Sequence, residues 1–289
     1  MPEGDILRRT AAQLDAALAG RVLERAELRW PSAGGVDLVG RTVLGTRPYG
    51  KHLLTRLDDG RTLHTHLRMD GAWRVRTADP GAPVRDHRVR AVLGAEGRLA
   101  VGHLLGMLDV VATRDEHTLV GHLGPDVLDD TFDDDGAATG IPPGRAGAVG
   151  IDAPGGPGLA SHYGPGHPGL AEAVSRWATR ARTPAAETLL DQRVVAGIGT
   201  IFTSESLFVE RLWPWTPAEA VADPARLLRT ARRLMTEALR LGYPRTRVHM
   251  KDGRPCVRCG ATIRRTLVRE PPQQRPIWWC PRCQAEPAG

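Results

Sequence analysis

Four cysteines near the carboxyl-terminal end constrain the fold of this chain more than any other feature of its sequence. Cys256 and Cys259 form one Cys-x-x-Cys pair, and Cys280 and Cys283 form a second pair after 20 intervening residues. This spacing is typical of two turns that hold four thiolates around one Zn²⁺ ion. A redox pair and chance spacing are the alternatives, whereas a disulfide framework belongs to small, cysteine-dense secreted domains. We therefore expect a structural zinc in a β-hairpin zinc finger over residues 250–285.

Composition and charge limit the classes of protein to which the chain can belong. Its 289 residues suggest about two domains, and 41% apolar with 25% charged residues excludes wholesale disorder. The net charge of +6 permits an anionic partner. No apolar run approaches the roughly 20 residues of a membrane helix, and the amino-terminal segment lacks the apolar core of a signal peptide. We expect neither a membrane segment nor a secretion signal.

The first 115 residues show two kinds of hydrophobic periodicity. A helix is predicted near the start, with Asp5 as its N-cap and Gly20 as its stop, because apolar residues recur along one face at Leu7, Ala11, Leu14 and Leu18. From about residue 22 to 113, short runs rich in Val and Leu alternate with turns such as Asp59-Gly60 and Glu96-Gly97. Seven or eight such strands predict a β-sandwich or a barrel-like domain, and we expect the β-sandwich.

The rest of the chain is predicted to be helical up to the cysteines. Residues 133–169 are dense in Gly, Pro and Ala, so we interpret them as an insertion in a linker over 116–170. A helical domain over 171–245 follows, with predicted helices at 170–182, 185–193, 204–210 and 225–241. The fold class is therefore α+β, with several domains. A β-domain, a helical domain and a zinc finger in one chain are typical of a protein that grips nucleic acid.

The amino-terminal Met1-Pro2-Glu3 segment could support chemistry. Removal of Met1 would expose the secondary amine of Pro2, and the pKa of an α-amino group is near ~8. Such an amine attacks an aldehyde carbon to give an iminium ion, and Glu3 is placed to donate a proton. An ordinary chain end is the alternative interpretation.

Three further segments could bind an anion. Lys51 lies between a glycine turn and an apolar strand, as a cation held against phosphate or as a solvated lysine at a strand edge. The turn containing Gly197 and Gly199 precedes a helix that begins near Thr200, where an anion would be favoured, although a tight corner without ligand has the same pattern. Arg275, between the cysteine pairs, could contact phosphate through both guanidinium nitrogens. The neighbouring Trp278-Trp279 pair is expected to pack the core of the zinc finger.

Taken together, these segments resemble the formamidopyrimidine-DNA glycosylase / endonuclease VIII family of base-excision repair enzymes, and within it the endonuclease VIII 2 branch. The resemblance covers most of the chain apart from about 130–170. It rests on Met1-Pro-Glu-Gly, Gly50-Lys-His-Leu-Leu, His66-Leu-Arg-Met-Asp-Gly71, His122-Leu-Gly-Pro-Asp126, Leu189-Leu-Asp-Gln through Gly199, and Arg275-Pro to Gln284, in this order.

The resemblance implies roles for individual residues. Pro2 would attack C1′ of a damaged nucleotide flipped out of the helix, and Glu3 would donate a proton. Lys51 would assist β-elimination and contact phosphate, while Arg275 would support δ-elimination. A helix–two-turn–helix motif at about 184–210, with Gly197, Gly199 and Thr200, would clamp the DNA backbone. Since flipping leaves a void that an apolar side chain can fill, we expect Met69 to be the wedge, with Arg68 beside it.

The chain departs from the family pattern at four places. Thr200 stands where the family usually has asparagine, and Ile6 stands where a glutamate is common. The loop Val101-Gly-His-Leu-Leu-Gly106 lacks the arginine and phenylalanine of the branch that removes oxidised purines, which favours oxidised pyrimidines. The insertion at 133–169 is about 30 residues longer than the family's connection, which a surface loop tolerates.

The sequence thus predicts a monomeric bifunctional DNA glycosylase and AP lyase that acts on damaged double-stranded DNA, with one structural zinc per chain. The resemblance implies a bacterial, cytoplasmic and nucleoid-associated protein. The departures at Thr200 and Ile6 keep open a protein of the same fold that only binds DNA, or that acts only on abasic sites. A zinc-stabilised RNA-binding module is the remaining alternative. The lesion and the choice between β- and β,δ-elimination do not follow from the sequence.

Overall fold

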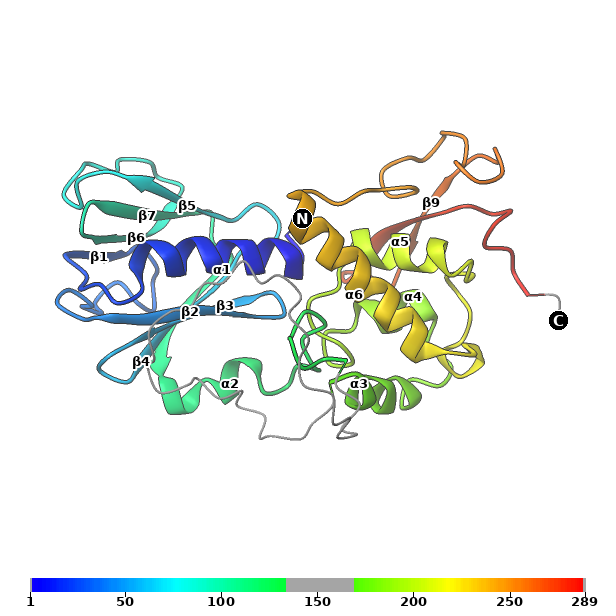
Figure 1. Ribbon diagram of the computed structural model, residues 1–289, viewed down its shortest axis with the longest axis horizontal. Coiled ribbons are helices and arrows are strands. Elements are labelled where there is room, and N and C mark those ends of the chain that lie inside the picture. Colours follow the sequence, from blue (N-terminus) through cyan, green and yellow to red (C-terminus); the bar gives the residue numbers. More distant parts are fainter. Residues whose placement is uncertain (1, 134–168, 288–289) are drawn as a thin grey trace, which may run out of the picture.

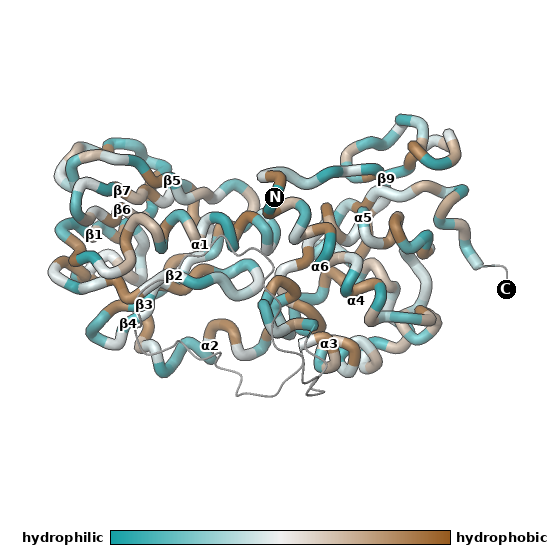
Figure 2. Tube along the Cα trace, viewed as in Figure 1, coloured by the Kyte–Doolittle hydropathy of each residue, from teal (hydrophilic) through white to brown (hydrophobic). Residues whose placement is uncertain are grey.

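The computed structural model describes residues 2–133 and 169–287. Almost all of the predicted insertion at 133–169 therefore lies outside the described residues. The described chain has a β-rich half and a helical half. Helix α1 (Gly4–Leu18) lies in the β-rich half, with its amino-terminal end at the junction (Figure 1). Hydrophobic residues occur in both halves (Figure 2), and each half has its own core of buried side chains.

Helix α1 forms where the periodicity predicts it, but its N-cap is not the predicted residue. Glu3 is the N-cap, and Asp5 lies buried in the first turn. The prediction was wrong because the carboxylate of Glu3 is committed to a distant segment, as described below, and the helix begins directly after it. The predicted stop at Gly20 agrees with its positive φ of 75°. The predicted apolar face is fully buried: Leu7, Ala11, Leu14 and Leu18.

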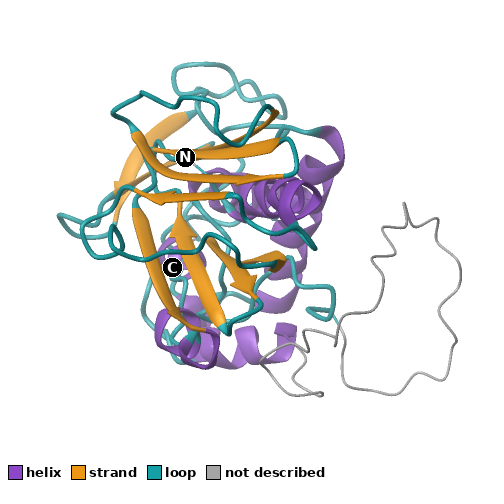
Figure 3. Cartoon of the chain, turned by 90° about the vertical axis from the view of Figure 1, so that its left-hand side faces the viewer, coloured by secondary structure: helices purple, strands orange, loops and turns teal. Residues whose placement is uncertain are grey.

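Eight strands form the predicted β-sandwich, as two four-stranded antiparallel sheets (Figure 3). One sheet has the order β1-β6-β7-β5 and the other β2-β3-β4-β8. The strands are β1 (Arg25–Leu28), β2 (Val43–Tyr49), β3 (His52–Leu57), β4 (Arg61–His66), β5 (Ala72–Thr77), β6 (Val89–Ala95), β7 (Arg98–His103) and β8 (Met107–Ala112). The apolar face of α1 packs in the core between them.

The turns that separate the strands follow the sequence signals. Gly60 and Gly97, in the two predicted hairpin turns, have φ of 77° and 72°, a conformation that glycine adopts at little cost. Strand β4 ends at His66. The chain turns sharply there, and a Cβ on Gly71 would lie 2.3 Å from the Leu67 carbonyl oxygen.

Short helices follow the sandwich, and a helical bundle completes the second half. Two predicted helices end early, at Ala178 instead of Arg182 and at Leu190 instead of Arg193. Pro184 disfavours helical conformation in the residue before it, and the Asp191 side chain accepts the Arg193 N–H to form a turn. The elements are η1 (Thr113–Asp115), α2 (His117–Val120), α3 (Gly169–Ala178), α4 (Ala185–Leu190), α5 (Thr200–Val209), η2 (Ala218–Ala220) and α6 (Pro224–Leu241).

Helix α6 shows the clearest end signals in the chain. The Asp223 side chain accepts the Arg226 N–H, Pro224 occupies the first turn, and Gly242 ends the helix with a φ of 85°. These are the preferred residues for each position. Arg9 of α1 donates to the Gly242 carbonyl oxygen, so the end of α6 is tied to the β-rich half.

The predicted zinc-finger hairpin consists of β9 (Arg264–Val268) and β10 (Arg275–Trp279), paired antiparallel. It docks on α5, because the Trp278 N–H donates to Ser204 Oγ at 3.1 Å. Trp278 is buried in a small cluster with Phe208, Val248 and Ile263, which confirms its expected role in packing. Within the described ranges, no helix is both long and apolar enough to cross a bilayer.

Candidate active site at the junction of the two halves

Three segments that are distant in the sequence meet at a buried carboxylate. Asp126 accepts the Gly50 N–H at 3.0 Å through one oxygen and the Leu128 N–H at 2.9 Å through the other. The same segment bonds Ala196, which donates to Pro125 O and accepts from the Val127 N–H. Asp126 thus fixes the turn before Lys51 against the turn that contains Gly197. Sequence reasoning missed its role, although a carboxylate between apolar residues was the available signal.

Glu3 occupies the amino-terminal end of helix α5. Its carboxylate accepts the N–H groups of Gly199 at 2.8 Å, Ile201 at 2.7 Å and Phe202 at 3.4 Å. The side chain is fully buried. Burial raises the pKa of Glu3 to about 7, although the positive charge of Lys51 and the bonded N–H groups oppose the rise. Near neutral pH the carboxyl group can therefore both donate and accept a proton.

The two glycines of the predicted anion turn make room for the amino-terminal segment of this same chain. Gly197 has a φ of 101°, and its carbonyl oxygen accepts the Gly4 N–H at 2.9 Å. A Cβ on Gly199 would lie 2.5 Å from Glu3 Cδ. Phosphate binding by this turn stays a prediction, because the amino-terminal end of α5 already receives a carboxylate of this same chain. That carboxylate is Glu3, which sequence reasoning did not place there.

Lys51 points into this junction. Its Nζ donates to the Ile198 carbonyl oxygen at 2.7 Å, so the alternative of a solvated lysine at a strand edge is wrong. Burial lowers the pKa of Lys51 to about 8, against the opposing effect of Glu3. The same carbonyl accepts from Gln192 Nε2 at 2.9 Å, and Gln192 Oε1 accepts the Gly197 N–H at 3.0 Å. Gln192 therefore braces the turn from the other side.

A chain of hydrogen bonds through three strands lies beside Lys51. His52 Nδ1 lies 2.8 Å from His64 Nε2, and His64 Nδ1 lies 3.0 Å from Asp109 Oδ2. The His66 ring packs edge-on against His52 at a centroid distance of 4.9 Å. Burial, more than the nearby positive charges, lowers the pKa of His52 to about 2 and that of His66 to about 4. These side chains are therefore neutral at pH 7. The sequence analysis did not identify this hydrogen-bonded series of His52, His64 and Asp109.

The structure also gives the surroundings of the remaining predicted residues. Pro2 is half-buried and directly precedes Glu3. Arg275 begins β10, and its Nη1 donates to the Gln274 carbonyl oxygen. Met69 is 59% exposed, as a wedge requires, and Arg68 precedes it with a φ of 50°. Thr200 is buried in the first turn of α5, so its hydroxyl has little open surface.

The four cysteines are arranged to bind a metal ion. All four sulfur atoms lie within 4.8 Å of one another. Cys256 and Cys283 are separated by 3.9 Å, and Cys259 and Cys280 by 3.5 Å. Tetrahedral zinc with Zn–S bonds near 2.3 Å separates its sulfurs by about 3.8 Å. The four thiols therefore fit one such ion.

Comparison with known proteins places this arrangement in a class. The domain family "Formamidopyrimidine-DNA glycosylase N-terminal domain" matches residues 1–103, and "Formamidopyrimidine-DNA glycosylase H2TH domain" matches residues 169–249. The chain belongs to the formamidopyrimidine-DNA glycosylase family, which confirms the predicted family and the predicted fold of sandwich, helix–two-turn–helix domain and carboxyl-terminal hairpin.

Within the family, the chain is similar to proteins named for endonuclease 8. It is 38% identical to "Probable endonuclease 8 2" of Streptomyces coelicolor over 100% of this chain and 95% of that one. It is 37% identical to "Endonuclease 8 2" of Mycobacterium bovis, over 98% and 100%. Among solved structures, MutM (Fpg) of Thermus thermophilus has a TM-score of 0.73 at 27% identity, covering 99% of this chain and 100% of that one.

Proposed function

We propose that this chain is a bifunctional DNA glycosylase and AP lyase that removes oxidised bases, pyrimidines above all, from double-stranded DNA. The observation that carries the proposal is Glu3, a buried carboxyl group with a pKa of about 7. It directly follows Pro2 and shares the junction with Lys51. A proton donor beside a candidate amine nucleophile is the pair that base removal through an iminium requires.

In the proposed reaction, the Pro2 nitrogen, freed by loss of Met1, bonds to C1′ of a flipped nucleotide. The bond to the base breaks, and the base takes the electron pair and the amine proton. Glu3 then donates its proton to O4′ as the C1′–O4′ bond breaks and the nitrogen lone pair forms the iminium. The Glu3 carboxylate, which has given its proton to O4′, then takes the C2′ proton. The electrons of that C–H bond pass into the iminium to form an enamine, and the enamine expels the 3′ phosphate with its bonding electron pair. Lys51 and Arg275 hold phosphates during these steps.

Several features support DNA as the partner. The chain carries a net charge of +6, and Met69 is exposed on a sharp turn as a wedge should be. A protein of the same fold from Lactococcus lactis, formamidopyrimidine DNA glycosylase, was crystallised bound non-covalently to DNA containing an AP site. The curated relatives are bacterial proteins, so we propose action on nucleoid DNA in the cytoplasm, as a monomer with one structural zinc.

A gel assay on a panel of duplexes tests the lesion preference. Duplexes containing thymine glycol, dihydrothymine, 8-oxoguanine or an abasic site are incubated with the mature protein, and the product ends are sized. We expect faster cleavage at the oxidised pyrimidines than at 8-oxoguanine, because the Val101–Gly106 loop lacks the purine-branch residues. Faster cleavage at 8-oxoguanine contradicts the pyrimidine preference. A 3′ phosphate indicates β,δ-elimination, and a 3′ unsaturated aldehyde indicates β-elimination alone.

A second candidate is a lyase that acts only at abasic sites. It is favoured by a relative from Mycolicibacterium smegmatis, 32% identical over 98% of this chain, named "DNA-(apurinic or apyrimidinic site) lyase Nei2". The same panel separates the two candidates. Cleavage of the abasic duplex with no cleavage of any base lesion would establish the second, whereas binding without cleavage would establish a protein that only grips DNA.

A further inference from the structure

Three cations meet at the junction of the zinc-finger hairpin and the Glu3 site. Besides burial, the charges of Arg269 and Arg275 lower the pKa of Lys51. Burial likewise lowers the pKa of Arg269, with contributions from Arg275 and Arg193, while Asp191 and Glu187 oppose the change. Arg269 and Arg275 stand at the two ends of the loop that joins β9 to β10. Like charges this close together destabilise the folded protein unless a bound anion offsets their repulsion.

Within residues 2–133 and 169–287, none of these three cations forms an ion pair with a carboxylate. Lys51 donates to the Ile198 carbonyl, and Arg275 donates to the carbonyl of Gln274. Arg269 Nη2 donates to the Glu187 carbonyl oxygen at a long 3.3 Å. Main-chain carbonyls satisfy hydrogen bonds without neutralising the charges. Three cations in one place, none of them in an ion pair with a carboxylate of the described residues, favour the binding of an anion.

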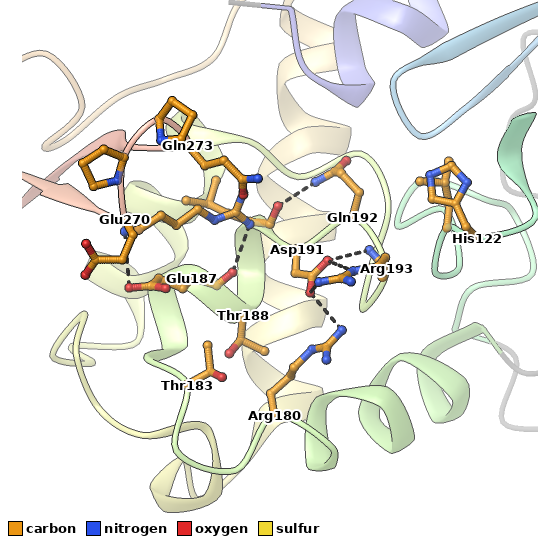
Figure 4. Close-up of a pocket in the computed structure, with 15 residues that line it drawn as sticks. His122, Arg180, Thr183, Glu187, Thr188, Asp191, Gln192, Arg193, Glu270 and Gln273 are labelled. Carbon is orange, nitrogen blue, oxygen red and sulfur yellow. Dashed lines mark hydrogen bonds and ion pairs between the residues drawn. The ribbon is translucent and has the colours of Figure 1, made fainter.

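Two of the neighbouring acidic side chains already have other partners, and a third is exposed. Asp191 lies between two other arginines, with Arg180 Nη2 at 2.9 Å and Arg193 Nε at 3.0 Å (Figure 4). One carboxylate oxygen of Glu187 accepts the main-chain N–H of Arg269 at 3.3 Å. Glu270, in the hairpin loop, is exposed to solvent. Asp191 and Glu187 therefore offset the guanidinium charge of Arg269 only in part, and neither forms an ion pair with it.

Arg269 is held in place at the wall of a cavity. Its main chain has a φ of 69°, and it bonds Glu187 of α4 through both its main chain and its side chain. The cavity, of about 750 Å³, lies between α4, the Asp191–Arg193 turn and the hairpin loop (Figure 4). Gln192 lines it and bonds the same Ile198 carbonyl that accepts from Lys51. The cavity therefore adjoins the Glu3 site.

We propose that Arg269 is a further DNA-binding residue, which binds one phosphodiester of the strand beside the phosphate held by Lys51 and Arg275. The assignment rests on the proposed function, since it presupposes DNA at the junction. The planar guanidinium matches two phosphate oxygens. The phosphate would replace the missing counter-charge of the three cations, and the loop from Arg269 to Arg275 would place both arginines along one strand.

A phosphate-replacement experiment tests the proposal. Abasic-analogue duplexes are prepared with a neutral methylphosphonate at each of the phosphates flanking the lesion, one at a time. Their affinities are measured for the wild type, Arg269→Ala, Arg269→Lys and Arg264→Ala. Arg264, exposed on β9 of the same hairpin, is the matched control because its removal makes the same change in net charge.

We expect Arg269→Ala to bind the unmodified duplex roughly ten- to a hundredfold more weakly, the effect of one charged hydrogen-bonding contact. Arg264→Ala should change affinity little, and Arg269→Lys should recover part of the loss. One methylphosphonate that weakens the wild type should no longer weaken Arg269→Ala. The slope of log affinity against log salt should fall by about 0.9.

Two outcomes overturn the assignment. The first is equal affinity of Arg269→Ala and Arg264→Ala for the unmodified duplex. The second is that every methylphosphonate that weakens binding by the wild type weakens binding by Arg269→Ala as strongly. The second result would mean that Arg269 only supports the loop. Failure of the wild type itself to bind or to cleave the abasic duplex would overturn the proposed function as well, so the two failures are distinguishable.

Discussion

The Glu3 junction and the zinc-finger hairpin differ in the partners of their charged side chains. At the junction, a buried carboxyl group receives three main-chain N–H groups and faces one lysine, so its charge is compensated within the protein. At the hairpin, the side chains of Arg269 and Arg275 bond main-chain carbonyls and no carboxylate in the part of the chain that the structure describes. The comparison indicates that the chemical centre is organised before substrate arrives, whereas the gripping surface is completed by the substrate.

The largest effect is expected from a substitution that changes the Glu3 junction and leaves the zinc-finger hairpin intact. Glu3→Gln keeps the shape but removes the titrating proton, so we expect base excision to fall by roughly 10²–10⁴-fold, the usual contribution of a general acid. DNA affinity should change little, because the cations of the hairpin are untouched. Single-turnover cleavage at a base lesion and a binding titration measure the two effects.

Glu219→Gln, at an exposed position in η2, is the matched control for this substitution. Equal loss of excision in both variants, or no loss in Glu3→Gln, would contradict the assigned proton donor.

The converse experiment breaks the hairpin and leaves the junction intact. Removal of the metal by a chelator, or Cys280→Ala, should release β9 and β10, since the cluster around Cys280 is small. Loss of both arginine contacts, at about 1.5–3 kcal/mol each, predicts roughly a hundredfold or greater loss of DNA affinity. Metal content by mass spectrometry and a binding titration check this, and readdition of zinc should restore the chelated protein. Retained affinity without metal would contradict the account.

A smaller effect is expected from crowding the junction. Gly199→Ala places a Cβ 2.5 Å from Glu3 Cδ, so one of the two segments must move. Overpacking of this kind costs roughly 1–3 kcal/mol, which should lower the melting temperature by a few degrees. Gly35→Ala, where a Cβ meets nothing within 4 Å, is the control. Equal melting temperatures for the two variants would show that the approach at Gly199 is looser than described.

The smallest expected effect concerns pH. Because the pKa of Glu3 is raised to about 7, its acid form is present below pH 7 and is lost above it. Base excision limited by this proton should therefore fall roughly fivefold between pH 7 and pH 8, as expected from a single titration. This fall in excision above pH 7 should be absent in Glu3→Gln. Excision that stays constant through pH 8 in the wild type would mean that another group supplies the proton.

Local patterns predicted the elements of the fold, but not how distant segments meet. The apolar spacing of α1 and the glycine turns of the sandwich were sufficient, because periodicity and positive φ are properties of short segments. The cysteine spacing identified the metal-binding cluster for the same reason. The contacts of Glu3 could not be predicted from local patterns. Its partners, Gly199 and Ile201, are almost 200 residues away, so neither its displacement of Asp5 as N-cap nor its raised pKa was visible in the sequence.

The roles of Asp126 and Arg269 were missed for a related reason. Asp126 accepts hydrogen bonds from the N–H groups of Gly50 and Leu128. Only the folded structure shows that it positions the turn before Lys51. Arg269 is one of 37 arginines, the 39 basic residues less Lys51 and Lys251. What singles it out is its place at the cavity wall beside Lys51 and Arg275, where burial lowers its pKa, and this is a property of its surroundings rather than of its sequence.

The identity of the nucleophile is the central claim, and one measurement tests it directly. The mature protein is incubated with abasic duplex and borohydride, and the trapped protein–DNA adduct is digested and mapped by mass spectrometry. We predict attachment at the nitrogen of Pro2. The chain has only two lysines, Lys51 and Lys251, so the competing primary amines are few. An adduct on Lys51, or no adduct from protein whose Met1 has been removed, would contradict the account.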